Sequence, residues 1–301
     1  MKKPLKYDKN KTIRIVAPAS PVKEDFLERG MKRVKKYFKY FSYNHLIFSK
    51  YFFLAGSDGE RAEDFNFAIN NFDFVWCARG GYGSLRILDR ILLNRKNFPI
   101  LLGSSDITSL LIFLTQKYNF ITFYGPMIAG EIADKKKVFD LKKLSGILKG
   151  ELGEGTPLND EKMVELIGGK LDGIITGGCM TLVLSSLGTP YEIDTRGKIL
   201  FLEDINVKPY AIDRMLQQLI KSGKFDECKG IIFGEMVNCI QNENQGYTLE
   251  ELIYENLKDL KIPVFFGFPC GHTYFGGTIL PIGGKIEVRD RKIFLKEKVV
   301  C

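Results

Sequence analysis

Short apolar runs alternate with amphipathic segments through the first half of the chain. Runs such as IRIVA and FVWC have the length of strands, and the segments between such runs carry apolar residues at helical spacing. This alternation is typical of βαβ units around a mainly parallel sheet. The predicted strands are 12–17, 44–48, 74–77, 100–102 and 122–123, and the predicted helices are 23–38, 59–70, 83–92 and 107–117.

From residue 138 the pattern weakens into a helix followed by a stretch rich in glycine and charge, KLSGILKGELGEGTPLNDEK. Glycine-rich turns and a closing β-meander indicate a mixed α+β arrangement beyond it. The predicted strands there are 198–202, 230–233, 264–268, 285–288 and 292–296, and the predicted helices are 180–187, 211–222 and 249–257. The 301 residues exceed one typical domain. We therefore expect an N-terminal α/β domain at 1–150, a linker at 151–164 and a C-terminal β-rich domain at 165–301.

Composition narrows the class of protein. The chain is 45% hydrophobic and 27% charged, values typical of globular domains rather than disordered chains. Charged residues interrupt every candidate for a membrane span of ~20 residues, and the basic start lacks the apolar run of a signal peptide. These features predict a cytoplasmic protein without a membrane partner.

The net charge of +8 raises the question whether the protein binds nucleic acid. The lysines stand in pairs and triplets among acidic residues, and no nucleic-acid module accompanies them, so we expect solvated helix faces and no nucleic-acid partner. The six cysteines are spread without a C-x-x-C pair, which argues against a zinc site and against a disulfide framework. Reduced thiols are the simplest interpretation.

The scarcity of histidine limits the chemistry. Only His45 and His272 are present, which disfavours metal sites built on several histidines and leaves two candidates for a histidine general base. His45 falls in the strand-like run NHLIF, where a structural role is expected. His272 falls in the loop FGFPCGHTYFGG, whose glycines let backbone approach a ligand closely.

Three further segments place polar groups at the ends of predicted strands. In ILLGSSDITSLLIFL, Ser105 stands at a strand-to-helix turn that resembles a nucleophile elbow, although Ile107 replaces the second glycine of the strict motif. A helix cap is the alternative for that serine. In ARGGYGSLR, a glycine-rich turn could cradle a phosphate, donate to an oxyanion or simply connect a strand to a helix. In KILFLEDIN, Glu203 ends a strand, and a carboxylate so placed could orient a histidine.

Five ordered motifs carry a family resemblance. RGGYGSLRILDRI, LLGSSDITSLLIFL, TFYGPM, LGTPYEIDTRGKILFLEDINVKPYAIDRMLQQL and PVFFGFPCGHTYFGGTILPIGG resemble the LD-carboxypeptidase (muramoyltetrapeptide carboxypeptidase) family of serine peptidases, which includes microcin C immunity hydrolases. The resemblance runs from about residue 12 to residue 288. It implies an N-terminal α/β sandwich with a mainly parallel sheet and a smaller C-terminal β-rich swivelling domain.

The resemblance also implies site residues. It places the nucleophile on Ser105, the orienting carboxylate on Glu203 and the general base on His272, with an oxyanion hole made by the backbone N–H groups of Gly81 and Asp106. Gly80 is the alternative to Gly81. The implied protein is a homodimer that needs no metal or organic cofactor and removes the terminal D-alanine of muropeptide tetrapeptides during cell-wall recycling.

Three positions depart from the family pattern. Ser104 replaces an aromatic residue, Tyr124 stands where histidine is frequent, and Cys179 replaces a polar residue such as asparagine. We interpret these as changes in pocket lining that affect substrate preference.

Two other functions stay open. An immunity-type hydrolase of peptidyl nucleotides would need an aromatic loop to stack a base, whereas the only tryptophan, Trp76, lies in a core-like strand. A non-catalytic module that binds a nucleotide or sugar phosphate would explain ARGGYG and the positive charge, but would leave Ser105, Glu203 and His272 without a role.

Overall fold

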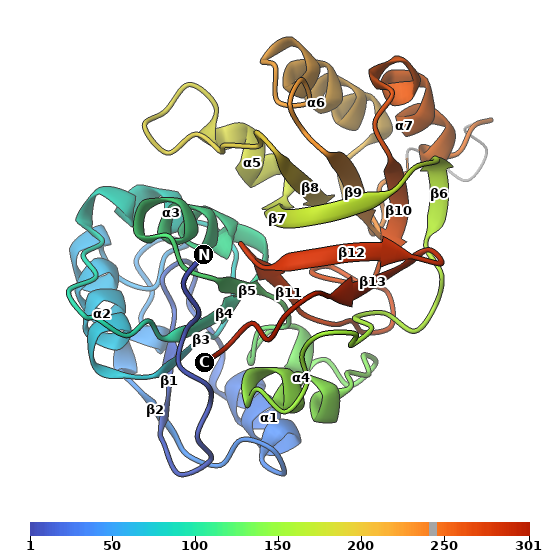
Figure 1. Ribbon diagram of the computed structural model, residues 1–301. Helices are drawn as coiled ribbons and strands as arrows, with labels where there is room; N and C mark the ends of the chain where they lie inside the picture. The colour runs from blue at the N-terminus through green and yellow to red at the C-terminus, as the bar shows by residue number, and fades with distance from the viewer. Residues whose placement is uncertain (241–245) are drawn as a thin grey trace.

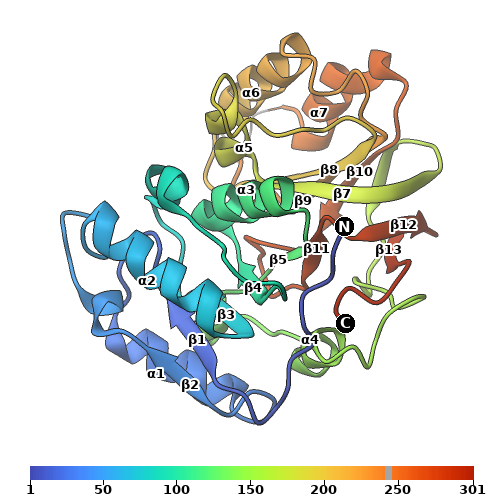
Figure 2. The ribbon, with the colours of Figure 1, turned by 60° about the vertical axis from the view of Figure 1, so that its left-hand side comes forward.

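Two β-sheets organise the molecule. The structure is a computed structural model, and it describes residues 1–240 and 246–301. Figures 1 and 2 show the first sheet with α1, α2 and α3 around it, and the second sheet beneath α6 and α7. This arrangement confirms the predicted α/β class with a second, β-rich unit.

The first sheet has the strand order β11-β5-β4-β3-β1-β2. Its strands are β1 (Ile13–Val16), β2 (Phe41–Tyr43), β3 (Phe74–Cys77), β4 (Ile100–Gly103), β5 (Thr122–Tyr124) and β11 (Leu280–Ile282). The first five are parallel, and β11 runs antiparallel to β5. Its helices are α1 (Glu24–Val34), α2 (Asp58–Asn71), α3 (Thr108–Tyr118) and α4 (Leu141–Leu148), with 3₁₀ turns η1 (His45–Phe48), η2 (Ser84–Arg90), η3 (Ser105–Ile107) and η4 (Glu131–Ala133).

The second sheet has the order β13-β12-β7-β8-β9-β10-β6. Its strands are β6 (Val164–Ile167), β7 (Leu171–Cys179), β8 (Lys198–Glu203), β9 (Gly230–Gly234), β10 (Val264–Phe268), β12 (Lys285–Arg289) and β13 (Lys292–Leu295). Strands β7 to β10 are parallel, and β6, β12 and β13 pair antiparallel at the edges. The helices are α5 (Met180–Ser186), α6 (Pro209–Lys221) and α7 (Leu249–Leu257), followed by the 3₁₀ turn η5 (Lys258–Leu260).

Strand β8 shows how the two units pack. Ile199 and Phe201 belong to the large core that is continuous with the first sheet, whereas Leu200 and Leu202 belong to a second core with α5, α6 and α7. Side chains alternate between the faces of a strand, so an unbroken apolar run such as KILFL indicates a sheet covered on both faces. One face of the second sheet therefore rests on the first unit.

Some predicted elements were wrong. Residues 44–48 were expected as a strand but form η1, because the Asn44 side chain accepts a hydrogen bond from the Leu46 N–H at 3.0 Å and starts a turn. The strand at this place is β2, just before it. Residues 83–92 were expected as an ordinary helix, and the structure forms the shorter 3₁₀ segment η2.

Three strands were missed: β6, β7 and β11. Five of the nine positions of β7 are glycine or polar, and β11 is a three-residue LPI segment that contains proline, so neither shows a clear strand pattern. Strand β11 pairs with the first sheet although it lies inside the predicted C-terminal domain. The boundary at 151–164 stays a prediction.

Candidate active site

Ser105 occupies a strained turn at the carboxyl end of β4. Its φ of +56° lies in the left-handed region, which costs a non-glycine residue about 1–2 kcal/mol. Two hydrogen bonds hold the turn: the Ser105 N–H donates to the Tyr124 hydroxyl at 2.9 Å, and the Thr108 hydroxyl donates to the Ser105 carbonyl at 2.6 Å. Strain of this kind is concentrated at functional sites.

The glycine-rich turn after β3 lies directly against this serine. Strands β3 and β4 are parallel neighbours, so their carboxyl ends meet at one edge of the sheet. A Cβ added to Gly80 would lie 2.9 Å from Ser105 Cβ and 3.2 Å from the Asp106 nitrogen. Gly81 instead packs against Ser20. The structure thus brings Gly80 closest to the predicted nucleophile, and the identity of the second oxyanion donor stays a prediction.

Asp106 anchors the same turn from inside. Its side chain is buried and accepts a hydrogen bond from the Ser84 N–H at 2.7 Å, and the Ser84 hydroxyl donates to the Asp106 carbonyl. Burial raises the pKa of the Asp106 carboxyl, against the lowering effect of the bonds from Ser84. The carboxyl of Asp106 therefore ties η3 to η2 and faces away from open solvent.

Glu203 and His272 form a buried pair. Glu203 ends β8 and is fully buried, and His272 follows β10 with 15% of its side chain exposed. His272 Nδ1 lies 2.8 Å from Glu203 Oε2 and 3.2 Å from Oε1, and the His272 backbone N–H donates to Oε2 at 3.0 Å. The carboxylate therefore fixes both the ring and the backbone of the histidine, as in an acid–histidine pair of a catalytic triad.

The pair depends on a close approach at Gly271. A Cβ at this position would lie 2.7 Å from both Glu203 Cδ and Tyr124 Cε1, and the backbone there has a φ of +81°. Only glycine adopts that conformation and leaves room for the carboxylate.

Charge sets the protonation of His272. Burial alone would lower its pKa, but the charge of Glu203 and the hydrogen bond to it prevail and raise the pKa of His272 to about 9. At neutral pH the unliganded imidazole therefore carries a second proton, which must leave before the ring can act as a base.

Tyr124 connects the two halves of the site. Its hydroxyl donates to Glu203 Oε1 at 2.5 Å while accepting the Ser105 N–H. Burial first, and then the charge of Glu203, raises the pKa of Tyr124, so the hydroxyl keeps the proton that it donates. A continuous chain of bonds runs from the backbone of Ser105 through Tyr124 and Glu203 to His272.

Sequence reasoning assigned Tyr124 to pocket lining and missed this connection. The sequence signal was the position of Tyr124 directly after the predicted strand 122–123. In the structure Tyr124 ends β5 and pairs in register with Gly103, two residues before Ser105. Cys179, another departure from the pattern, is buried, and its backbone N–H donates to the Thr108 hydroxyl at 3.0 Å. Ser104 is buried as well.

The other residues that the sequence analysis considered lie outside this site. His45 is exposed and packs edge-on against Phe48. Trp76 is buried in the first sheet and donates to the Pro126 carbonyl at 2.9 Å. Within residues 1–240 and 246–301, no three histidine, cysteine or acidic side chains are grouped so that they could hold a metal ion. In the same ranges, no helix has the length and apolar character needed to cross a bilayer.

Comparison with known proteins identifies the family of this chain. Residues 13–125 match the LD-carboxypeptidase N-terminal domain and residues 172–288 match the LD-carboxypeptidase C-terminal domain. The "Probable murein peptide carboxypeptidase" of Bacillus subtilis (strain 168) is 34% identical over 94% of this chain and 90% of its own length. The chain is thus a hydrolase with a two-sheet α/β fold.

Two solved structures show the same fold. The muramoyltetrapeptide carboxypeptidase from Oxalobacter formigenes superposes with a TM-score of 0.80 at 26% identity, covering 96% of this chain and all of the other. The microcin C7 self-immunity protein MccF superposes with a TM-score of 0.89 at 23% identity over the full length of both chains. This protein belongs to the LD-carboxypeptidase family.

Proposed function

We propose that this protein is a serine carboxypeptidase that hydrolyses the amide bond before the terminal D-alanine of muropeptide tetrapeptides, with Ser105, Glu203 and His272 as its triad. The observation that carries the proposal is the buried Glu203–His272 pair, joined through Tyr124 to the strained turn of Ser105. Similarity to the murein peptide carboxypeptidase of Bacillus subtilis supports the substrate class. A homodimer and a role in cell-wall recycling stay predictions of the resemblance.

In the proposed mechanism, the neutral imidazole of His272 accepts the proton of Ser105 Oγ as the oxygen attacks the scissile carbonyl. The oxyanion accepts hydrogen bonds from the backbone N–H groups of Asp106 and Gly81, with Gly80 as the alternative to Gly81. His272 then protonates the leaving D-alanine nitrogen, and a water activated by the same ring releases the acyl group. Glu203 keeps the ring oriented and stabilises its charged form.

Ser105 and His272 make no direct hydrogen bond to each other within the described chain. Such bonds are frequently long in unliganded enzymes and shorten when substrate binds. We propose that a rotation of the Ser105 side chain or a shift of the His272 loop completes the triad when substrate binds.

The direct test supplies the protein with a muramyl tetrapeptide ending in D-alanine and with the same peptide ending in L-alanine. We expect free D-alanine from the first and no alanine from the second. Hydrolysis of an aminoacyl-sulfamoyl adenosine without release of D-alanine would assign an immunity-type activity instead. Trp76 is buried and cannot stack on a base, which favours the peptide substrate. Turnover of neither compound would show that the proposed function is wrong.

The pH dependence follows from the pKa of His272. The pKa is raised above the ordinary value of 6.5 to about 9, so the fraction of neutral imidazole falls as the pH drops through that value. We expect kcat/KM for D-alanine release to decline about tenfold per pH unit on the acidic side of this midpoint. Measured rates between about pH 6 and pH 10 test it. An acidic limb centred near the unperturbed value of ~6.5 would contradict the pairing with Glu203.

Tyr124→Phe tests the connection between the sheets. The change leaves the Ser105 N–H without its acceptor and removes a donor from Glu203, so we expect kcat/KM to fall about 10- to 100-fold. Without the Tyr124 hydrogen bond, the negative charge of Glu203 acts more strongly on His272 and raises its pKa further. The midpoint of the acidic limb of the pH profile should therefore move upward. A merely structural role would leave that midpoint unchanged.

Tyr118→Phe is the matched control for this exchange. The Tyr118 hydroxyl accepts the Leu93 N–H at 3.2 Å and donates to the Ile91 carbonyl at 3.4 Å, and neither partner is a residue of the site. We expect it to lower stability slightly while leaving the pH profile in place.

A further inference from the structure

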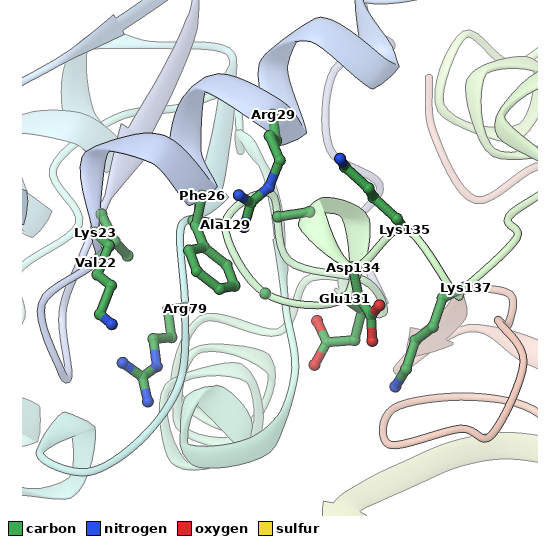
Figure 3. Close-up of a pocket in the computed structure, with 12 residues that line it drawn as sticks. Val22, Lys23, Phe26, Arg29, Arg79, Ala129, Glu131, Asp134, Lys135 and Lys137 are labelled. Atoms are coloured by element: carbon green, nitrogen blue, oxygen red, sulfur yellow. The ribbon is translucent and has the colours of Figure 1, made fainter.

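A large cavity lies beside the turn that carries the predicted nucleophile. It has a volume of about 800 Å³ and is bounded by α1, the turn after β3 and residues 129–137 (Figure 3). Arg79, which lines it, directly precedes the glycine that approaches Ser105. The Ala129 N–H donates to the Ala78 carbonyl at 2.9 Å, so the second wall adjoins the same turn.

The far wall of the cavity adjoins the histidine loop. Lys137 lines the cavity, and the next residue, Val138, donates its N–H to the Phe275 carbonyl at 2.6 Å. Glu131, a further lining residue, is among the carboxylates whose charge raises the pKa of His272. The cavity therefore extends from the turn of the nucleophile to the loop of the general base.

The loop that carries Lys137 is held in place by the half-buried Arg33. The Arg33 guanidinium of α1 donates to three carbonyls, those of Ile132 at 2.7 Å, Asp134 at 2.5 Å and Lys137 at 2.6 Å. Three bonds from one guanidinium fix residues 132–137 against the helix. The wall is thus preformed, as is usual for ligand sites.

Positive charge dominates the lining. Five lining side chains are cationic, namely Lys23, Arg29, Arg79, Lys135 and Lys137, and two are acidic, Glu131 and Asp134. Both acidic side chains accept hydrogen bonds from their own loop, Glu131 from the Met127 N–H and Asp134 from the Lys136 N–H, each at 2.9 Å. Figure 3 shows Arg79 and Lys137 on opposite sides of the Glu131 carboxylate.

Most of the cations that line the cavity form no ion pair with a described carboxylate. Arg29 pairs with Asp25 at 2.9 Å, but Lys23, Arg79, Lys135 and Lys137 have no carboxylate within 4 Å in the described ranges. The only hydrogen bond of the Arg79 guanidinium in these ranges is a long one, 3.3 Å, to the Pro21 carbonyl. Its planar fork of donors suits a carboxylate, which it can bind with two parallel bonds.

We propose that this cavity is a substrate subsite in which Arg79 and Lys137 bind a carboxylate of the peptide while Ser105 attacks the neighbouring amide. The inference rests on the proposed function, because a muropeptide tetrapeptide supplies the anion. Two of its carboxylates qualify: the C-terminal group of D-alanine and the side-chain group of a diaminopimelate at the third position. Either would place the anionic part of the substrate in the cavity and the scissile carbonyl at the nucleophile.

Binding to Ser105→Ala protein separates this subsite from catalysis. Three peptides are titrated by calorimetry: the diaminopimelate tetrapeptide, its C-terminal amide, and the version with lysine at the third position. We expect the peptide that lacks the recognised carboxylate to bind about 10- to 100-fold more weakly, and the other two to bind alike. A loss with the amide identifies the C-terminal group, and a loss with the lysine peptide identifies the side-chain group.

A second substitution then tests whether each cation binds the recognised carboxylate. Arg79→Gln and Lys137→Gln, each added to Ser105→Ala, are expected to weaken the full tetrapeptide by the same 10- to 100-fold, and to change binding of the peptide without that carboxylate less than about threefold. Lys32→Gln removes one exposed charge from α1 outside the cavity and is the control, with unchanged binding expected. Equal binding of all three peptides, or equal weakening of all three by Arg79→Gln, would overturn the subsite.

The two proposals fail separately. If the unsubstituted protein releases no D-alanine while the carboxylate-dependent binding persists, the proposed reaction is wrong and the subsite stands. If D-alanine is released but neither Arg79→Gln nor Lys137→Gln distinguishes the peptides, the reaction stands and the subsite is wrong.

Discussion

Replacing Ser105 with alanine is expected to reduce D-alanine release from a muramyl tetrapeptide by at least several hundredfold. The substitution removes the attacking oxygen but leaves the backbone bonds of the turn, since the Ser105 N–H still donates to Tyr124 and the carbonyl still accepts from Thr108. Loss of kcat should therefore exceed any change in the dissociation constant of the peptide. The measurement is single-turnover release of D-alanine beside a binding titration.

The matched control is Ser109→Ala, one helical turn further along the chain. The Ser109 hydroxyl is buried and has no hydrogen-bond partner in the described ranges, so its removal should leave kcat within a fewfold of the parent. Release of D-alanine by Ser105→Ala protein at the parent rate would exclude Ser105 as the nucleophile.

Glu203→Gln is expected to lower kcat by about four orders of magnitude, the effect known for the buried acid of a serine triad. The amide has nearly the same size but cannot compensate the charge of the imidazolium, and its N–H₂ group can favour the wrong tautomer of His272. Because the charge of Glu203 raises the pKa of His272, the variant should also show its acidic limb at lower pH. The sign of this shift is opposite to that expected for Tyr124→Phe, so the two pH profiles check each other.

Glu235→Gln is the control for this exchange. Glu235 accepts the Tyr274 N–H at 2.7 Å and so contacts the same loop as His272, but it makes no bond to the imidazole in the part of the chain described here. Burial raises the pKa of Glu235. Glutamine has nearly the same size and keeps an oxygen that can accept the Tyr274 N–H. We expect less than tenfold loss of kcat and no shift of the pH profile. A Glu203→Gln protein that behaves like this control would remove Glu203 from the triad.

The order of hydrophobic residues along the chain was sufficient to predict most strands. Runs such as IRIV and FVWC form β1 and β3 at nearly the predicted limits, because a parallel strand buried on both faces is apolar at most positions. The exception, Arg14 in β1, pairs with Asp64. The same reasoning placed Glu203 at the end of β8 and Ser105 just after β4, where parallel strands deliver side chains to a common edge.

The local pattern of hydrophobic residues was insufficient to predict secondary structure where a few hydrogen bonds decide the backbone conformation. Residues 44–48 have the composition of a strand, but the Asn44 cap turns them into η1. In β11, pairing with β5 compensates for a short segment with proline, and that pairing joins residues more than 150 positions apart. Periodicity within one segment carries no information about such a partner.

By itself, the sequence determined the α/β class, the strand ends that carry Ser105 and Glu203, and the loop that carries His272. Tertiary structure alone decided that the face of the second sheet rests on the first, which brings Tyr124 of β5 against Glu203 of β8. It also decided that cations from the start of α1, the turn after β3 and residues 129–137 surround one cavity. The physical reason is that hydrogen bonds and charges act over a few ångströms in space, whereas sequence patterns report only which face of each element is buried.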